Sequence, residues 1–530
     1  MRSFRLSLTF LAVLTAVLIP AGSAGAKTFT VTSTGDSPVG ATLRAAIEAA
    51  NVNADDDTID IQATGTIGLL GPLPPLEHEL EILGPGAGSL TVSRAASADF
   101  RIFHVGSGAK VEVADLTIAN GRSPGGGGIF SQGPLTLRRV VVRDNEAVGS
   151  GGVEARAVGG GIYALAPLTV LESSIRGNKA KASGGTSSTL AQYGGLFANE
   201  EASIVASTIS GNSVEAVSGP NVTAEGGGMT LLSGPATVER STISGNSVTA
   251  ANGTNLTVAE AGGLSNFDNL TLSGVTVTAN SVTSTKTAAA ANLKLPLDTL
   301  IRSTIVSAPQ GASSCKGTSI SGGFNIEDGF GCGFGEATDR DGTDPGLDPV
   351  LRDNGGPTPT HALLPASVAI DRGSAFGATT DQRGLPRPLD FAAVSNVEGG
   401  DGSDIGAFEL QPAPPPPGSP ILVPAVRGDT EPAGRGDTDP PNTRIVSGPS
   451  RVTFERRAKF RFASTEAQSS FRCKVDRRPW RGCRNPFKRT VGAGVKAGRK
   501  HVLKVRAIDR FGNVDPTPAR FGWRVKRIAG

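Results

Sequence analysis

Only a few side chains in this sequence have the types and spacing that metal binding or catalysis needs. Asp339, Asp341 and Asp344 place three carboxylates within one predicted turn, as in loops that bind Ca²⁺, although the distant glutamate of an EF-hand is missing. Asp55–Asp57 is a second run of carboxylates, and glycoside hydrolysis needs two carboxylates held at a fixed separation. The pattern leaves a calcium site open and identifies no catalytic, cofactor-binding or metal-binding residue.

The four histidines do not form a recognisable catalytic set. His78, His104, His361 and His501 are far apart, and none lies in the Gly-His-Gly motif of pectinase-like enzymes. A site assembled from Asp, Arg or Lys residues of successive structural repeats would escape a search for motifs. An enzyme acting on polysaccharides, whether lyase, hydrolase or epimerase, therefore stays as the alternative to a non-enzymatic protein.

The four cysteines are better explained as two disulfides than as a metal site. A four-cysteine zinc site normally shows two Cys-x-x-Cys pairs, and the sequence contains none. Cys315 lies near Cys332, and Cys473 lies near Cys483, so local pairing within each couple is the simplest prediction. Disulfides also indicate an oxidising compartment.

Two markers recur together with a period of about 34 residues through the central part of the chain. The first is an asparagine column at Asn145, Asn178, Asn212, Asn246 and Asn280. The second is a glycine pair followed by one apolar residue, at 127–129, 160–162, 194–196, 227–229 and 262–264. Short runs of alternating β-branched residues lie between the markers, which is typical of strands with one buried face. The fold class is therefore predicted to be all-β, with a right-handed parallel β-helix of stacked coils.

Both markers have structural explanations. Asparagine tolerates left-handed turn geometry, and stacked amides can pass hydrogen bonds from coil to coil. The glycine pair lets the backbone turn where a Cβ would clash. The segments between each Asn and the next glycine pair are rich in Ala, Ser, Thr and Gly, so we expect loops on one edge of the solenoid. That edge is a candidate face for contact with glycans, with polar decoration as the alternative.

The N-terminus has the features of a signal peptide. Arg2 and Arg5 precede an apolar run from Leu6 to Ile19, and Ala24–Ala26 offers the small residues of a cleavage site. We expect a mature chain that begins at Lys27 and is secreted or associated with the cell surface. No later run of apolar residues approaches the length of a membrane-spanning helix.

A cap is predicted at the N-terminal end of the solenoid, because an open end would expose sheet edges. Thr28–Thr32 is expected to form a strand, followed by a helix from Leu43 to about Ala50. Thr42 would cap this helix and Asn51 would end it.

These N-terminal segments carry a family resemblance. Phe29–Asp36, Thr42–Asn51 and Asp57–Ile59 resemble the CSLREA domain that begins many bacterial surface β-helix proteins. Ala41 stands where that motif has its cysteine, and Ala45 replaces its glutamate. The Gly-Gly-Ile and Ile-x-x-Asn repeats are similar to those of polymorphic outer membrane proteins, which are adhesin-like surface β-helices.

The end of the repeat region resembles a second family. Asp344–His361, Asp381–Gly384 and Asp404–Glu409 resemble the choice-of-anchor Q region, and the segment from Cys315 to Cys332 fits its closing coil. Together the resemblances cover residues 28–410. They imply a surface location more firmly than any reaction.

The C-terminal part differs from the rest in charge. From Pro441 to the end the chain has 24 basic and 5 acidic residues, whereas residues 27–440 have 25 basic and 43 acidic residues. Alternating runs after Thr443 predict a small immunoglobulin-like or fibronectin-III-like β-sandwich. Its expected core comprises Phe460, Phe462, Phe471, Val475, Leu503, Val505 and Trp523. Such a charge would attract extracellular polyanions or acidic glycans.

The predicted organisation has six parts: a signal peptide at 1–26, an N-terminal cap with the first coils at 27–110, the β-helix repeats at 111–310, a choice-of-anchor Q-like region at 311–410, a Pro- and Gly-rich linker at 411–442, and the basic domain at 443–530. The expected function is adhesion or contact with matrix and glycans, without catalysis. A purely structural surface protein is a further alternative.

Overall fold

The computed structural model describes residues 26–52, 55–296, 299–412, 440–448, 452–453, 457–464, 469–476, 478–483, 487–490, 500–508 and 513–525. The predicted signal peptide, Ala26 excepted, and most of the predicted linker lie outside these residues. The chain divides into two compact units, Met1–Ala413 and Pro414–Gly530. Within the described residues, both units are all-β apart from one short helix in the first.

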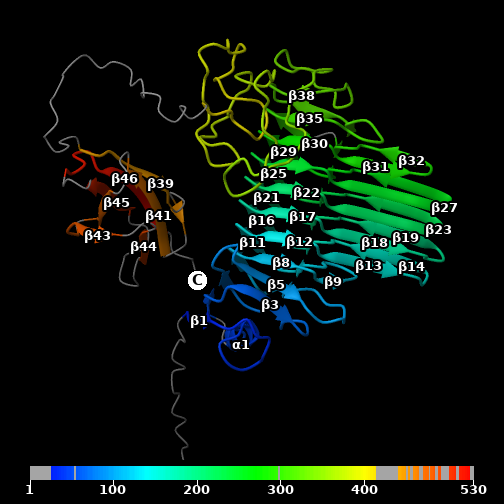
Figure 1. Cartoon of the computed structure of the whole chain (residues 1–530), viewed down its shortest axis with the longest axis horizontal. Coiled ribbons are helices and arrows are strands. Elements are labelled where there is room, and N and C mark those ends of the chain that lie inside the picture. The colour runs from blue at the N-terminus through cyan, green and yellow to red at the C-terminus, as the bar shows by residue number, and fades with distance from the viewer. Residues whose placement is uncertain are drawn as a thin grey trace, which may run out of the picture. The chain divides into compact units, whose positions relative to one another are not determined.

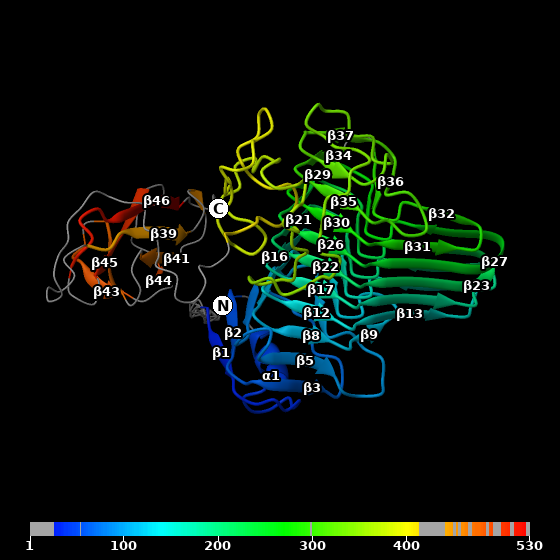
Figure 2. The ribbon, with the colours of Figure 1, turned by 45° about the horizontal axis from the view of Figure 1, so that its top comes forward.

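The first unit is a parallel β-solenoid, because up to three short strands recur in each coil and each pairs in parallel with its equivalent in the next coil (Figures 1 and 2). Sheet 1 has 11 strands: β1 Thr28–Val31, β2 Asp57–Ile61, β4 Leu80–Leu83, β7 Val111–Ala114, β11 Leu135–Arg138, β16 Leu168–Leu171, β21 Ala202–Val205, β25 Ala236–Glu239, β29 Leu270–Ser273, β34 Thr299–Arg302 and β37 Ser319–Ser321. The predicted stacking of coils is confirmed.

The two other sheets of the coil have 10 and 8 strands. Sheet 2 comprises β3 Gly65–Leu69, β5 Leu90–Arg94, β8 Thr117–Ala119, β12 Val141–Arg143, β17 Ser174–Arg176, β22 Thr208–Ser210, β26 Thr242–Ser244, β30 Thr276–Thr278, β35 Ile305–Ser307 and β38 Ile326–Glu327. Sheet 3 comprises β6 Phe103–Val105, β10 Ile129–Ser131, β15 Ile162–Ala164, β20 Leu196–Ala198, β24 Met229–Leu231, β28 Leu264–Asn266, β33 Leu293–Lys294 and β36 Cys315–Lys316.

Apolar side chains of successive coils stack on one another inside the solenoid. In sheet 3, Ile129 pairs with Ile162, which pairs with Leu196, and the column continues through Met229 and Leu264. All five side chains are buried. A single coil has no such interior, so each coil depends on its neighbours for the burial that stabilises it.

The cap at the N-terminal end agrees with the prediction. Helix α1 spans Leu43–Ala50, and the Thr42 hydroxyl accepts a hydrogen bond from the Ala45 amide, which satisfies one of the free donors of the first turn. Leu43 and Ile47 face inward and are fully buried. The helix therefore closes the open end of the core.

The segments expected to be loops are strands, and this expectation was wrong. After Asn145, Asn178 and Asn280 the chain forms two short strands, and after Asn212 and Asn246 it forms one long strand, β23 or β27, that takes the place of both; all pair in parallel with neighbouring coils. We call this projection the fin (Figures 1 and 2). It comprises β9 Arg122–Ser123, β13 Glu146–Ser150, β14 Glu154–Val158, β18 Lys179–Ser183, β19 Ser188–Gln192, β23 Ser213–Glu225, β27 Ser247–Glu260, β31 Ser281–Ser284 and β32 Thr287–Ala289.

Small side chains fill the space between the two layers of the fin. The buried positions alternate along the strands, as Ala180 and Ala182 do in β18, and most of the others are also Ala or Val. Small residues allow the two layers to approach closely, so the fin is a thin plate with its own apolar interior. The fin still lies on one side of the solenoid, as expected for the variable segments.

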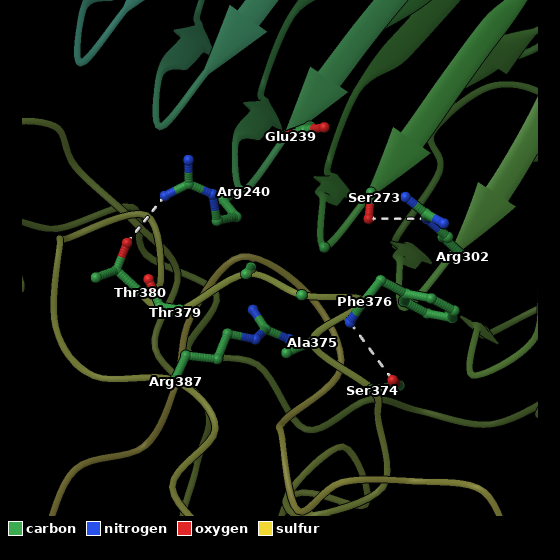
Figure 3. Close-up of a pocket in the computed structure, with 13 residues that line it drawn as sticks. Glu239, Arg240, Ser273, Arg302, Ser374, Ala375, Phe376, Thr379, Thr380 and Arg387 are labelled. Atoms are coloured by element: carbon green, nitrogen blue, oxygen red, sulfur yellow. Dashed lines mark hydrogen bonds between the residues drawn. The ribbon is translucent and has the colours of Figure 1, made fainter. Parts of the chain in front are cut away.

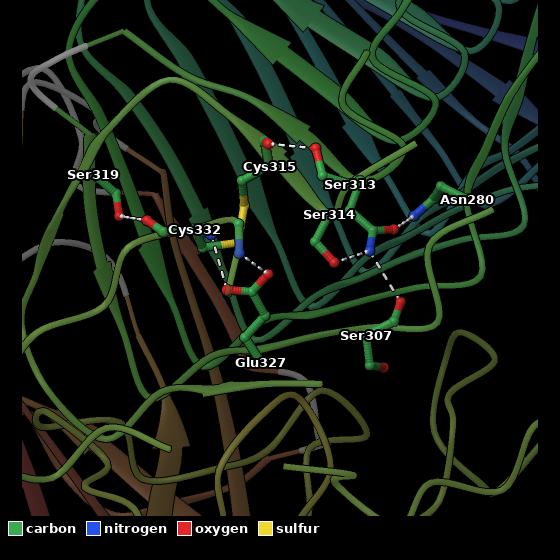
Figure 4. Close-up of a disulfide and its surroundings, with 10 residues drawn as sticks. Asn280, Ser307, Ser313, Ser314, Cys315, Ser319, Glu327 and Cys332 are labelled. Carbon is green, nitrogen blue, oxygen red and sulfur yellow. Dashed lines mark hydrogen bonds between the residues drawn. A yellow bond between two sulfur atoms is a disulfide. The ribbon is translucent and has the colours of Figure 1, made fainter. Parts of the chain in front are cut away.

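The last coil is closed by a disulfide and by the segment that follows. Cys315 of β36 is bonded to Cys332, as predicted (Figure 4). Glu327 of β38 is fully buried, and its carboxylate accepts hydrogen bonds from the amides of Gly331 and Cys332, each 2.8 Å long. Burial raises the pKa of Glu327. Residues 341–410 then contain only isolated bridges and pack on the outer face of sheet 2; we call them the wrap.

The second unit has two sheets around one core. One is antiparallel, with β39 Thr443–Ser447, β41 Arg457–Ser464 and β44 Phe487–Thr490. The other has the order β40 Val452–Thr453, β46 Ala519–Val525, β45 Lys500–Ile508, β42 Ser470–Val475 and β43 Arg481–Cys483. All seven predicted core residues pack together, and the predicted disulfide Cys473–Cys483 joins β42 to β43.

Among the described residues, no helix has the length and apolar character needed to cross a membrane.

Candidate functional sites

The five asparagines form one hydrogen-bonded column inside the solenoid. Each of their side chains is fully buried. The Asn178 amide nitrogen donates to Oδ1 of Asn212 at 2.9 Å, and Asn212 donates in the same way to Asn246 at 3.0 Å. The same pattern runs from Asn145 to Asn280, and the column ends on Asn292. All donors are used within the protein, so the column is structural.

The reason given for asparagine was wrong in one respect. The left-handed residue is the one before each Asn, such as Asp144 (φ 56°) or Gly211 (φ 60°), and none of the five asparagines has a positive φ. Asparagine is needed for its amide, which bonds both the next amide and a backbone carbonyl of the preceding coil.

Buried serines form a second hydrogen-bonded column, which was not predicted from the sequence. The Ser173 amide donates to the Ser207 hydroxyl, and the Ser207 amide donates to the Ser241 hydroxyl, each at 3.1 Å. These serines are buried between sheets 1 and 2. Ser followed by Ser or Thr and then Ile recurs at the period of the repeat, so the signal was present in the sequence.

The glycine pairs and the asparagine column are one structural device. A Cβ on Gly228 would lie 2.5 Å from the carbonyl oxygen of Gly263 and 2.9 Å from the amide of Asn246. Gly161 and Gly195 have the same relation to Asn178 and Asn212. The two markers share a period because each amide packs directly on a glycine.

Hydrogen bonds from backbone amides and from one serine hydroxyl hold the calcium-like turn. Asp339 accepts hydrogen bonds from the amides of Asn325 and Glu336 and from the Ser321 hydroxyl. Asp344 accepts from the amide of Gly346, and burial raises the pKa of Asp341. Across the part of the chain that the structure describes, no three His, Cys, Asp or Glu side chains are arranged to hold a metal ion. The three carboxylates are not brought together.

His361 fastens the wrap to the solenoid. Its Nε2 lies 2.7 Å from the Ser244 hydroxyl, and its Nδ1 lies 2.7 Å from the carbonyl oxygen of Asp348. Burial lowers the pKa of His361. A neutral ring that donates from Nδ1 and accepts at Nε2 satisfies both contacts, so the histidine has a structural role.

The motifs of the wrap that carry the family resemblance are also internal contacts. Gln382 bonds the hydroxyls of Thr208 and Thr242 on sheet 2. Arg387 is almost fully buried and lies 3.3 Å from Glu409. Burial raises the pKa of Glu409 to about 8. These polar residues attach the wrap to the coils.

One charged cluster spans several coils, as a dispersed catalytic site would. Lys294 lies 2.6 Å from Glu225 and 2.7 Å from Glu260, and Lys316 also pairs with Glu260. Burial favours a higher pKa for Glu260, but the hydrogen bonds and charges of the two lysines lower its pKa overall. A glycosidase acid requires a raised pKa. The cluster therefore has the properties of a structural ion-pair ladder.

Aromatic rings stack along the outer face of sheet 3. Phe130 pairs in register with His104 and Tyr163, and Tyr163 pairs with Phe197. The Tyr163–Phe197 and Tyr193–Phe197 centroids are 4.9 and 4.3 Å apart with nearly parallel planes. Burial raises the pKa of Tyr193 to about 12. Because the rings turn their faces to one another, they contribute to stability and offer little flat surface to a sugar.

The second unit has a basic face. Basic residues alternate with core residues along three neighbouring strands and point away from the core, namely Arg472, Lys474, Lys504, Arg506, Arg520 and Arg524. We call these six the basic face. Within the described residues none of the six forms an ion pair. Lys474 and Arg506 lie 5.1 and 4.5 Å from the ring centroid of Trp480, which therefore belongs to the same face.

Comparison with protein-family models gives no match for this chain, and no curated protein matches it. The resemblances of residues 28–410 stay predictions, and function has to be inferred from geometry.

Proposed function

We propose that the protein is an exported, non-enzymatic β-solenoid protein that contacts extracellular polyanions or acidic glycans. The basic face carries this proposal. Arg472 lies directly opposite Arg506, and Lys504 lies between Lys474 and Arg520 on the neighbouring strands. Desolvation and the positive charges of Arg520 and Lys474 lower the pKa of Lys504.

Like charges directly opposite each other destabilise a sheet. A sheet that keeps three such contacts on one face gives up stability, and a bound polyanion would offset the repulsion. Trp480 adds an aromatic surface beside the charges, which suits a ligand with both anionic groups and flat rings. The fin offers two further polar faces for contact with glycans.

We expect the variant Lys504→Gln/Arg520→Gln to bind polyanions more weakly than the wild type. Affinity for a short DNA duplex should be measured over a range of salt concentrations. Each lost phosphate contact should reduce the slope of log K against log[salt] by about one. The thermal stability of the variant should be equal or higher, because a repulsive contact has been removed.

Arg143→Gln/Arg176→Gln is the matched control, since it removes two positive charges from registered positions of sheet 2, the half-buried Arg143, which pairs with Asp144, and the exposed Arg176. Equal loss of affinity in both variants, or binding by the wild type that salt does not weaken, would reject the basic face as the site.

Export is supported by a contact of Lys27, the first residue of the predicted mature chain. The Lys27 amide donates to Oδ1 of Asp57 at 2.8 Å, and Asp57 is 3% exposed. The other carboxylate oxygen of Asp57 is buried without a hydrogen-bond partner. Cleavage after Ala26 would convert this amide into an ammonium group next to a buried carboxylate, which would then be neutralised.

We expect Asp57→Asn to lower the melting temperature of the cleaved chain and to leave that of the uncleaved precursor nearly unchanged. Asparagine still accepts from an amide but cannot neutralise an ammonium group. Mass spectrometry of the exported protein should find Lys27 as its first residue. A different first residue, or equal destabilisation of both forms, would contradict the proposal.

Two alternatives and two finer descriptions of the fold complete the proposal. A polysaccharide-active enzyme would release products from a glycan panel, and a purely structural surface protein would bind none of its members.

We further propose that the solenoid is right-handed and that the second unit is an immunoglobulin-like sandwich. The single core shared by its two sheets supports the latter.

A further inference from the structure

A pocket of about 310 Å³ lies between sheet 1 and the wrap (Figure 3). Arg240, Ser273 and Arg302 contribute from the solenoid, and Phe376 and Arg387 contribute from the wrap. Its volume is at the lower end of known ligand pockets, of about 300–1,000 Å³, and therefore suits a single small group. The whole pocket lies within the first unit.

Two of the arginines that line the pocket, Arg240 and Arg302, are held in place by neutral groups. Arg240 donates to the Thr380 hydroxyl at 3.0 Å, and Arg302 donates to the Ser273 hydroxyl at 3.1 Å. The Arg302 guanidinium also lies 4.5 Å from the ring centroid of Phe376. Gly274 lies at the corner of the coil between the coils of Arg240 and Arg302. A Cβ on Gly274 would lie within 4 Å of Arg240 and Arg387.

Arginines at the same two coil positions elsewhere have carboxylate partners. Arg138 ends its strand of sheet 1 as Arg302 does, and Arg138 pairs with Glu112. Arg139 occupies the left-handed corner as Arg240 does, and Arg139 pairs with Asp115.

Among the described residues, neither Arg240 nor Arg302 lies within ion-pair distance of a carboxylate, although Glu239 lines the same pocket. Arg387 alone is paired, with Glu409. The equivalent arginines of the earlier coils are neutralised by carboxylates, whereas the positive charges of Arg240 and Arg302 at the pocket are not.

We propose that this pocket binds the carboxylate of a uronic acid residue, as found in acidic polysaccharides. One guanidinium group can bind both oxygens of a carboxylate, and the pocket offers two guanidinium groups without a carboxylate partner. The hydroxyls of Ser273 and Ser374 can bond sugar hydroxyls, and Phe376, about one-third exposed, offers an apolar wall for the sugar ring. The site is separate from the basic face and does not depend on it.

The test uses the full chain and trigalacturonate, with binding followed by calorimetry. The variant Arg240→Gln/Arg302→Gln should bind at least tenfold more weakly than the wild type, whereas Arg143→Gln/Arg176→Gln, which removes the same charge, should bind normally. Lys504→Gln/Arg520→Gln should also bind trigalacturonate normally, so failure of the pocket and failure of the basic face are distinguishable.

A second variant tests the pocket without removing an arginine. Ser273→Asp places a carboxylate beside Arg302 within the pocket, so it should abolish binding of trigalacturonate and raise the melting temperature. Unchanged binding by Ser273→Asp, or equal loss in the Arg240→Gln/Arg302→Gln variant and its control, would overturn the proposal. Equal affinity for inorganic sulfate, or for the neutral sugar maltotriose, would overturn the assignment to a uronic acid.

Discussion

Replacing Asn212 by alanine is expected to lower the free energy of unfolding by about 4 kcal/mol or more, because several buried groups lose their partners at once. Oδ1 of Asn212 accepts from the amide and the side chain of Asn178. Its Nδ2 donates to the carbonyl of Ile175 and to Asn246. The site is fully buried, so water cannot replace these contacts.

Chemical denaturation, together with hydrogen exchange of the neighbouring coils, would measure the effect. Asn221→Ala is the control, since Asn221 lies exposed on the fin and makes one side-chain bond, to the Ser187 carbonyl. A surface change of this kind should stay within about 0.5 kcal/mol. If Asn212→Ala lost no more stability than Asn221→Ala, the amide column would not be the element that holds the coils in register.

Local patterns were sufficient to predict the solenoid and its N-terminal cap. The spacing of Asn145 to Asn280 gave the coil, because the same position must recur in every turn of a stacked structure. The capping helix followed from Thr42 and the apolar stripe that includes Leu43 and Ile47. The disulfides followed from proximity in sequence.

The fin was not predicted, because its strands have an unusual composition. Alternation is present in β18, but the buried residues Ala180 and Ala182 are small, and alanine is depleted in ordinary strands. Only the parallel pairing with neighbouring coils makes such a sequence a strand. Polar Ser- and Thr-rich segments around these positions therefore suggested loops.

The pocket was not predicted, because its parts are distant in sequence. Arg240 and Thr380 are 140 residues apart and meet only because the wrap returns along the solenoid. These residues form no sequence motif. The observation that identifies the pocket is that Arg240 and Arg302 lack a carboxylate partner, and only a three-dimensional structure can show this. By contrast, the basic face could be anticipated from the alternation of basic and apolar residues in 500–508.

Gly228→Ala is expected to destabilise the solenoid by about 3 kcal/mol, more than a glycine substitution normally costs, because a Cβ has no space there. The two nearest atoms belong to the backbone of Gly263 and to the buried amide of Asn246, so neither can move without disturbing a neighbouring coil. Because the φ angle of Gly228 is not in the left-handed region, the predicted cost comes from packing alone.

Gly211→Ala separates packing from backbone conformation. Gly211 has a φ of 60°, and a Cβ there would meet no atom within 4 Å, so its substitution should cost only the conformational strain of about 1 kcal/mol. Both variants should be compared by chemical denaturation. A larger loss for Gly211→Ala than for Gly228→Ala would show that the glycines are kept for their backbone angles. The predicted order would show that the glycine pair recurs with asparagine because the amide column needs its space.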